Sequence, residues 1–168
     1  PDYTIPNGIT VIGKAFKATA YDGSPMDVRY SSNGNLADVN YENISSLAVE
    51  AGNIALSQGS FLQDGATLSI ASGAKLNVAD LGNVTVGRFI GGGSLILGKS
   101  QTLTVSGDVE GETEVTFNGQ ADTTMLGRTY LTAVKSSENA FRLGKLNIPA
   151  EWELKRDGNG NWSLQKST

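Results

Sequence analysis

The sequence predicts an all-β protein whose main body is a short β-solenoid, and two observations lead to this fold class. Pairs of apolar residues separated by one residue recur along residues 47–117, which is the alternation of strands with one buried face. Gly, Asn, Asp and Ser punctuate the chain between these pairs, as expected for turns. The pairs are Leu47/Val49, Ile54/Leu56, Leu68/Ile70, Leu76/Val78, Val84/Val86, Leu95/Leu97, Leu103/Val105 and Val115/Phe117.

Two packing schemes explain such pairs. In an antiparallel β-sandwich the strands fold back through hairpins, whereas in a solenoid each strand stacks on its equivalent one coil away. Pairs taken three at a time repeat every 27 to 31 residues, and pairs taken two at a time repeat every 16 to 22 residues. The first series is the more regular and predicts a three-sided coil. Because this block lacks tight hairpin turns between long strands, the solenoid is favoured and the sandwich is the alternative.

The chain divides into three expected parts. Residues 1–40 contain short strand patterns and are expected to cap one end, because a solenoid must cover its terminal strand edges. Residues 41–119 form the solenoid core, and residues 120–168 supply further strands and a cap. Within this last part residues 152–156 and 161–165 flank the turn at residues 157–160, which predicts a β-hairpin with both tryptophans on one face.

The glycine-rich strings at residues 89–98 (FIGGGSLILG) and 101–107 (QTLTVSG) add a resemblance. They resemble the degenerate repeats of bacterial surface or secreted proteins with right-handed β-helices, including autotransporter passengers and adhesin-like modules. The resemblance implies a right-handed coil and an extracellular or cell-surface setting.

Composition excludes several kinds of chemistry. The chain has no cysteine and no histidine, which removes disulfides, thiolate nucleophiles, histidine bases and the commonest zinc ligands. Its net charge of −4 and pI of about 4.8 offer no attraction to a phosphate backbone, so nucleic acid is not an expected partner. No apolar run reaches the ~18 residues of a membrane span, so membrane insertion is not expected. The start at Pro-Asp-Tyr without methionine suggests a fragment of a longer protein.

Aromatic rings are the candidate ligand-binding residues. Sugar C–H faces stack on exposed rings, while amides and carboxylates bind the hydroxyl groups. The predicted ligand-binding residues are Tyr30, Tyr41, Trp152 and Trp162. For the two tryptophans, packing as a cross-strand pair under the last coil is the competing interpretation.

The candidate calcium ligands are Asp157, Asn159 and Asn161, which place oxygen atoms on alternate residues as in the first half of a calcium loop. The glycine and glutamate expected later in that motif are absent, so a plain hairpin turn is favoured. No other cofactor is expected.

Catalysis would have to use carboxylates. Asp108, Glu110, Glu112 and Glu114 alternate and would project from one strand face, where a carboxylate pair could hydrolyse glycosides. Such a row of like charges is more typical of a solvated face, and the chain is predicted not to be an enzyme. An outward ladder of Thr and Ser could also match an ice lattice, but the intervening Lys75 and Asn77 disfavour that use.

The function expected from the sequence is a non-catalytic extracellular module of a larger bacterial surface or secreted protein, used for adhesion or carbohydrate contact. Its partners would be a glycan or host-cell ligand and other domains of the same chain. The alternatives are a structural spacer beside a catalytic or anchoring domain and, less favoured, a polysaccharide-cleaving enzyme.

Overall fold

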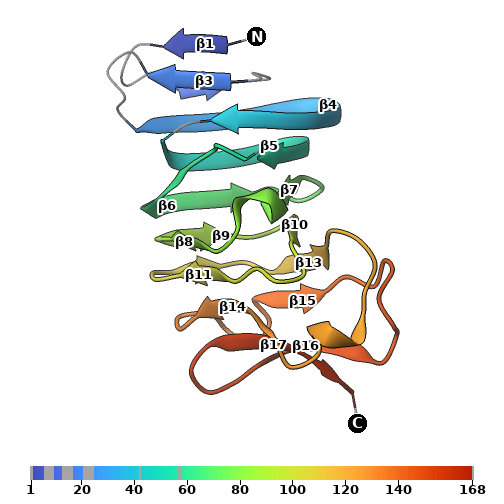
Figure 1. Ribbon diagram of the computed structural model, residues 1–168. Coiled ribbons are helices and arrows are strands. Elements are labelled where there is room, and N and C mark those ends of the chain that lie inside the picture. The colour runs from blue at the N-terminus through green and yellow to red at the C-terminus, as the bar shows by residue number, and fades with distance from the viewer. Residues whose placement is uncertain are drawn as a thin grey trace.

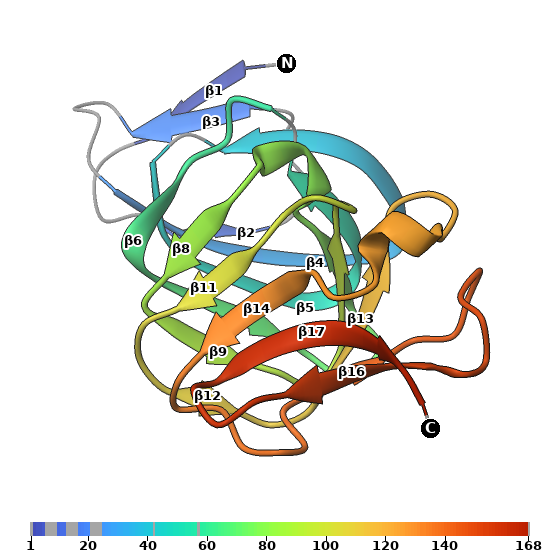
Figure 2. The same ribbon diagram turned by 60° about the horizontal axis from the view of Figure 1, so that its bottom comes forward.

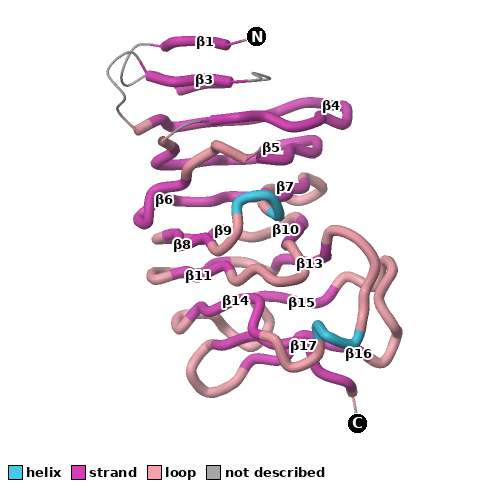
Figure 3. The backbone as a smooth tube through the Cα atoms, in the orientation of Figure 1, coloured by secondary structure: helices cyan, strands magenta, loops and turns pink. Residues whose placement is uncertain are grey.

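The computed structural model describes the backbone of residues 2–5, 10–12, 17–20, 25–41, 43–56 and 58–167, and the side chains of residues 25–31, 43–56 and 58–167. The protein is all-β and forms a β-solenoid of about four turns with parallel strand pairing (Figure 1). Strands dominate the backbone trace, and helix is confined to two short turns among the described residues (Figure 3).

The described elements are β1 (Asp2–Ile5), β2 (Thr10–Ile12), β3 (Lys17–Ala20), β4 (Met26–Tyr41), β5 (Ile44–Leu56), β6 (Leu62–Ile70), β7 (Lys75–Asn77), η1 (Ala79–Leu81), β8 (Val84–Val86), β9 (Arg88–Ile90), β10 (Ser94–Leu97), β11 (Leu103–Val105), β12 (Val109–Glu110), β13 (Thr113–Phe117), η2 (Thr123–Met125), β14 (Thr129–Ala133), β15 (Phe141–Leu143), β16 (Trp152–Arg156) and β17 (Asn161–Lys166).

Each coil has three sides, and each side is a stack of parallel strands. Side A consists of β8, β11 and β14, extended by the antiparallel β17. Side B consists of the first half of β5 with β6, β9 and β12. Side C consists of the second half of β5 with β7, β10, β13 and β15. In Figure 2 the chain passes from β11 through β12 to β13 counterclockwise as the coils advance toward the viewer, which is the right-handed sense.

The solenoid is confirmed, but the predicted period is wrong. On side C, Leu76, Leu95 and Val115 are direct neighbours in register, which makes the coil 19 to 20 residues long rather than 27 to 31. The coil nevertheless has three sides. Side B carries a single buried apolar residue in its later strands, such as Phe89 in β9, so only two apolar pairs occur per coil. The parallel pairing from β4 to β15 also contradicts the antiparallel sandwich.

The core is a set of aliphatic rows that run through the middle of the coils. Leu47 and Leu68 lie beside Phe89 in register on side B, and Val84 and Leu103 continue into Leu131 on side A. All of these side chains are buried. Burial of apolar area stabilises a fold by roughly 25 cal/mol per Å². The apolar pairs seen in the sequence therefore stabilise the stack of coils by filling its core.

The predicted C-terminal hairpin is confirmed and closes the last coil. Leu154 and Leu164 are direct cross-strand partners in the antiparallel pair β16–β17, and β17 pairs with β14. The ring of Trp162 packs edge-on against Phe141 with centroids 5.3 Å apart, and Phe141 contacts Phe89 at 5.6 Å. The hairpin therefore covers the apolar end of the stack with aromatic side chains. Figure 1 shows β16 and β17 at this C-terminal end of the solenoid.

The parallel stacking extends beyond both limits expected for the core. β4 begins at Met26, within the part expected to cap the N-terminal end, and pairs in parallel with β5. β14 and β15 lie beyond residue 119 and pair in parallel with β11 and β13. The solenoid therefore includes more of the chain than residues 41–119. Strands whose sequences alternate only weakly between apolar and polar residues also stack in it.

Candidate functional site

The acidic residues at positions 108–114 do not share one strand face. Gly111, with a φ of 74°, turns the chain between β12 on side B and β13 on side C, so Glu110 and Glu114 lie on different sides. Glu110 forms an ion pair with Arg88 on the preceding coil, and Glu114 approaches Arg142 on the following coil at 4.0 Å. The expected carboxylate row is therefore wrong, and these acids form ion pairs between coils.

Three of the four predicted ligand-binding rings lie in the core. Tyr30, Trp152 and Trp162 are 0, 3 and 1% exposed, so none presents a ring face to a sugar. The indole N–H of Trp162 donates to Ser136 Oγ at 3.0 Å, which satisfies its one polar atom inside the protein. For the tryptophans this agrees with the packing interpretation. The side chain of Tyr41 lies outside the described residues.

The oxygen-rich string after β16 forms a hairpin turn. Asp157 Oδ1 accepts from the backbone N–H groups of Asn159 and Asn161 at 2.8 and 3.0 Å, and Oδ2 accepts from the Asn161 amide. The backbone hydrogen bonds from Asn161 and Asn159 lower the pKa of Asp157. Asn161 Oδ1 in turn accepts from Thr132. These oxygens bind protein donors in the arrangement of a turn.

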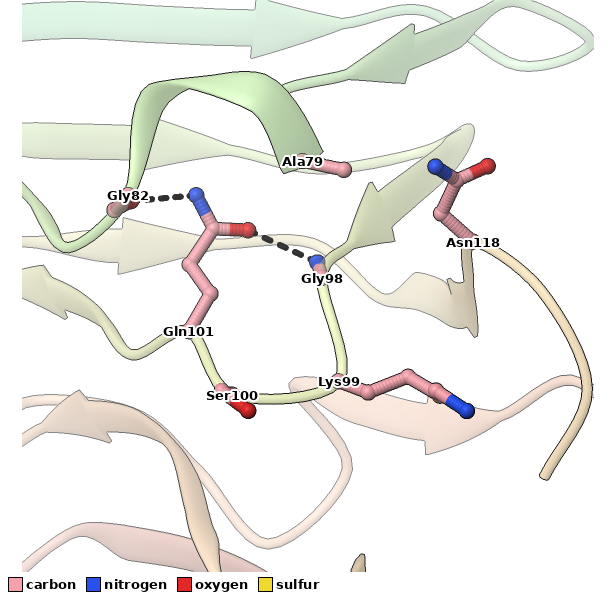
Figure 4. Close-up of a pocket in the computed structure, with 7 residues that line it drawn as sticks. All are labelled: Ala79, Gly82, Gly98, Lys99, Ser100, Gln101 and Asn118. Carbon is pink, nitrogen blue, oxygen red and sulfur yellow. Dashed lines mark hydrogen bonds between the residues drawn. The ribbon is translucent and has the colours of Figure 1, made fainter. Parts of the chain in front are cut away.

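A corner pocket of about 370 Å³ lies between the η1 turn and residues 98–101 (Figure 4). Its most buried polar side chain is Gln101, which is 4% exposed. Gln101 Oε1 accepts from Gly98 N at 2.8 Å, and its Nε2 donates to the carbonyls of Val78 and Gly82. The Gln101 amide therefore uses both of its polar atoms to join the turn at residues 98–101 to the η1 turn. This gives the pocket a structural role.

A larger cleft of about 560 Å³ lies beside β15 and the hairpin, and Glu112, Glu138 and Glu153 are among its lining residues. A glycosidase needs one carboxyl group with a raised pKa as its acid. The hydrogen bond from Lys155 instead lowers the pKa of Glu153, which holds it as a carboxylate. Among the described residues, no group of three or more acidic side chains is placed to hold a metal ion.

A third depression has the residue types that recognise sugars. This Phe61 groove, of about 270 Å³, lies between residues 60–64 and the start of β8, and it is lined by Phe61, Asp64, Asn83 and Thr85 among others. Phe61 is 57% exposed and is the one exposed aromatic ring among the side chains that the structure describes. Within the same part of the chain, neither the Asp64 carboxylate nor the Thr85 hydroxyl has a hydrogen-bond or ion-pair partner.

Thr85 connects the groove to the outer surface of side A. Figure 2 shows β8, β11, β14 and β17 side by side. Their outward residues Thr85, Thr104, Thr132 and Asn161 are aligned by the strand register, and we call them the hydroxyl row. Lys75 and Asn77 do not interrupt this row, because they lie on β7 in side C.

Phe61 is not among the ring residues predicted from the sequence, which are all tyrosines and tryptophans. A signal was present, since Phe61 directly precedes the buried Leu62 at the start of β6. Adjacent residues of an extended chain point to opposite sides, so a buried Leu62 at the first position of the strand predicts an outward Phe61 just before it.

None of the described segments forms a helix of sufficient length and apolarity to cross a membrane. Comparison of the chain with protein-family models, curated proteins and solved structures finds no match. The function must therefore be inferred from the geometry of the groove and the surfaces around it.

Proposed function

We propose that this chain is a non-catalytic carbohydrate-contacting module of a larger bacterial surface or secreted protein, and that the Phe61 groove is its contact site. The observation that carries the proposal is the placement of one exposed aromatic ring beside a carboxylate, an amide and a hydroxyl in a single groove. These are complementary to the apolar C–H face and the polar edge of a sugar ring.

Each polar group has a distinct capacity for hydrogen bonding. Asn83 Oδ1 accepts from Thr102 N at 2.9 Å, which fixes the amide and leaves its NH₂ group as a donor. The Asp64 carboxylate is an acceptor and the Thr85 hydroxyl can act in either sense. The groove thus offers both donors and acceptors to neighbouring sugar hydroxyls.

The test is binding of the 168-residue chain to an array of neutral and charged polysaccharides, together with insoluble cellulose and chitin. Wild type is expected to bind at least one of them. Phe61→Ala should reduce that binding about tenfold or more, because stacking on a ring is lost while the fold remains. Leu146→Ala is the matched control, since Leu146 is another exposed apolar residue, 76% exposed and remote from the groove in sequence.

Thermal unfolding of both variants establishes that each is folded. Binding by Phe61→Ala equal to that of wild type, or no binding by wild type to any member of the array, would overturn the proposal.

A structural role beside other domains is the alternative, and closure of the last coil by β16–β17 supports it. A folded wild-type chain that binds nothing on the array would favour this alternative.

A further inference from the structure

We infer that the ligand of the Phe61 groove is a linear, neutral polysaccharide that continues out of the groove along the hydroxyl row, across the strands of side A. The inference rests on the proposed function and specifies the ligand class and its direction. It depends on three properties of side A, namely its continuity with the groove, its regular spacing and the uncharged side chains of the four row residues.

Continuity comes from Thr85, which belongs to both features. Thr85 lines the groove and is also the first member of the hydroxyl row, with Thr104 as its direct register partner on the next coil. Thr104 is followed by Thr132, and Thr132 by Asn161 on β17. A chain held at Phe61 therefore meets this row when it leaves the groove toward the C-terminal coils.

The spacing of the row suits a linear polymer. Neighbouring strands lie about 4.8 Å apart, so each step along the row is close to the length of one pyranose unit. Three strand spacings separate Thr85 from Asn161, which is about 14 Å in all. A chain of four or more sugar units is therefore needed to contact both the groove and the far end of the row.

The charge of the surface selects a neutral polymer. Thr85, Thr104, Thr132 and Asn161 carry no charge, and neither do Asn83, Thr102, Thr129 and Ser163. Charged neighbours lie at the far end of the row, where the Asp157 carboxylate accepts from the Asn161 amide and Lys155 is the register partner of Ser163. The one ionisable residue among those named in the groove is the acidic Asp64. An anionic polysaccharide in the groove would thus approach a carboxylate that has no ion-pair partner among the described residues, whereas a neutral one would gain hydrogen bonds.

The hydroxyls of the row are not equivalent. Thr132 Oγ1 donates to Asn161 Oδ1 at 3.0 Å, but Thr104 Oγ1 has no hydrogen-bond partner among the described residues. Of the row threonines outside the groove, Thr104 is therefore the one whose hydroxyl can be removed with least effect on the protein itself. Thr104 lies outside the groove, so removal of its hydroxyl tests the row without changing the Phe61 contact.

The experiment measures affinity by titration calorimetry for β-1,4-linked gluco-, manno- and xylo-oligosaccharides of two, four and six units, with oligogalacturonates of the same lengths as anionic counterparts. Affinity for at least one neutral series should rise about tenfold or more from two to six units. Thr104→Val should weaken binding of the hexamer about three- to tenfold, which is the loss of one hydrogen bond, and leave the dimer unchanged. Thr116→Val is the control, since Thr116 is an outward threonine on side C.

The outcomes separate this inference from the proposed function. Two results would overturn the role of the hydroxyl row while leaving the Phe61 groove as the contact site. One is a Phe61-dependent affinity that is the same for the dimer and the hexamer. The other is a hexamer affinity that is the same for wild type and Thr104→Val. Preference for the oligogalacturonates would overturn the neutral ligand class. Absence of binding to every neutral series would overturn this inference, and if the full array is also negative the proposed function fails with it.

Discussion

The indole N–H of Trp162 and the hydroxyl of Ser136 form a buried hydrogen bond of 3.0 Å at the C-terminal end of the solenoid. Ser136 Oγ also accepts from Arg156 Nε at 3.2 Å and donates to the carbonyl of Ala133 at 2.6 Å. One hydroxyl thus uses its donor and both acceptor positions to join the hairpin to the end of β14. This network fixes Trp162 as a core residue.

Ser136→Ala should therefore destabilise the protein. It leaves the Trp162 and Arg156 donors without their acceptor, and a buried unsatisfied group costs about 1–3 kcal/mol. The measurement is the free energy of unfolding in urea, followed by tryptophan fluorescence. Ser137→Ala, at an exposed neighbouring position, should stay within about 0.5 kcal/mol of wild type. Equal effects of the two substitutions would show that the buried network contributes little.

Gly160 closes the hairpin turn and should not tolerate a side chain. Its φ is 81°, and a Cβ added there would lie 2.5 Å from the Ala133 carbonyl oxygen. Both the backbone conformation and the contact with β14 oppose alanine, so Gly160→Ala should cost about 2 kcal/mol or more. Gly158→Ala is the matched control in the same loop, because no atom lies within 4 Å of its Cβ position. Unfolding midpoints that are the same for both variants would contradict this prediction.

Gln101 should be more important for stability than its polar character suggests. Gln101→Ala leaves Gly98 N and the carbonyls of Val78 and Gly82 without the amide that now binds them. We expect a loss of about 2 kcal/mol or more in the free energy of unfolding, since several buried groups lose their partner together. Gln120→Ala, at an exposed position, should have little effect. A Gln101→Ala variant as stable as the control would mean that water replaces the amide.

Asp122 should make stability depend on pH in the acid range. Hydrogen bonds from Thr124 and from Lys99, which lies 2.9 Å away, lower the pKa of Asp122 from 3.8 to about 2. Because the folded pKa is the lower one, the stabilisation is fully present above the unfolded value of 3.8 and disappears as the pH falls toward 2. The difference in melting temperature between wild type and Asp122→Asn should therefore shrink over this interval.

An NMR titration of the Asp122 carboxyl carbon tests the cause directly. Lys99→Met should raise the measured pKa of Asp122 toward 3.8 without fully restoring it, because the hydrogen bonds from Thr124 remain. A pKa of 3.8 in the wild-type protein would refute the proposed effect of these partners.

Much of the architecture is readable from local patterns. The alternation of Leu76 with Val78 and of Leu95 with Leu97 identifies buried strand positions, because a strand side chain can face only one of two ways. The hairpin around residues 157–160 is equally local, since its turn residues and flanking apolar residues lie close together in sequence.

The coil period was not readable in the same way. Phe89 is the sole buried residue of β9, and such a short strand gives no alternation to count. Its place on side B is decided by stacking on Leu68, 21 residues earlier in the chain, and no local pattern encodes that contact. The same reason explains why Glu110 and Glu114 were expected to share a face that Gly111 divides.

The sequence by itself determined that this protein is a stack of short strands around an aliphatic core, closed by a tryptophan hairpin, because burial and turn chemistry act on neighbouring residues. Only the tertiary structure decided which polar residues meet on the outside. Phe61, Thr85 and Thr104 come from three different segments of the chain, and the register between coils brings them to one surface. That register is set by the packing of buried side chains, so the outer surface could be recognised only once the coils were in place.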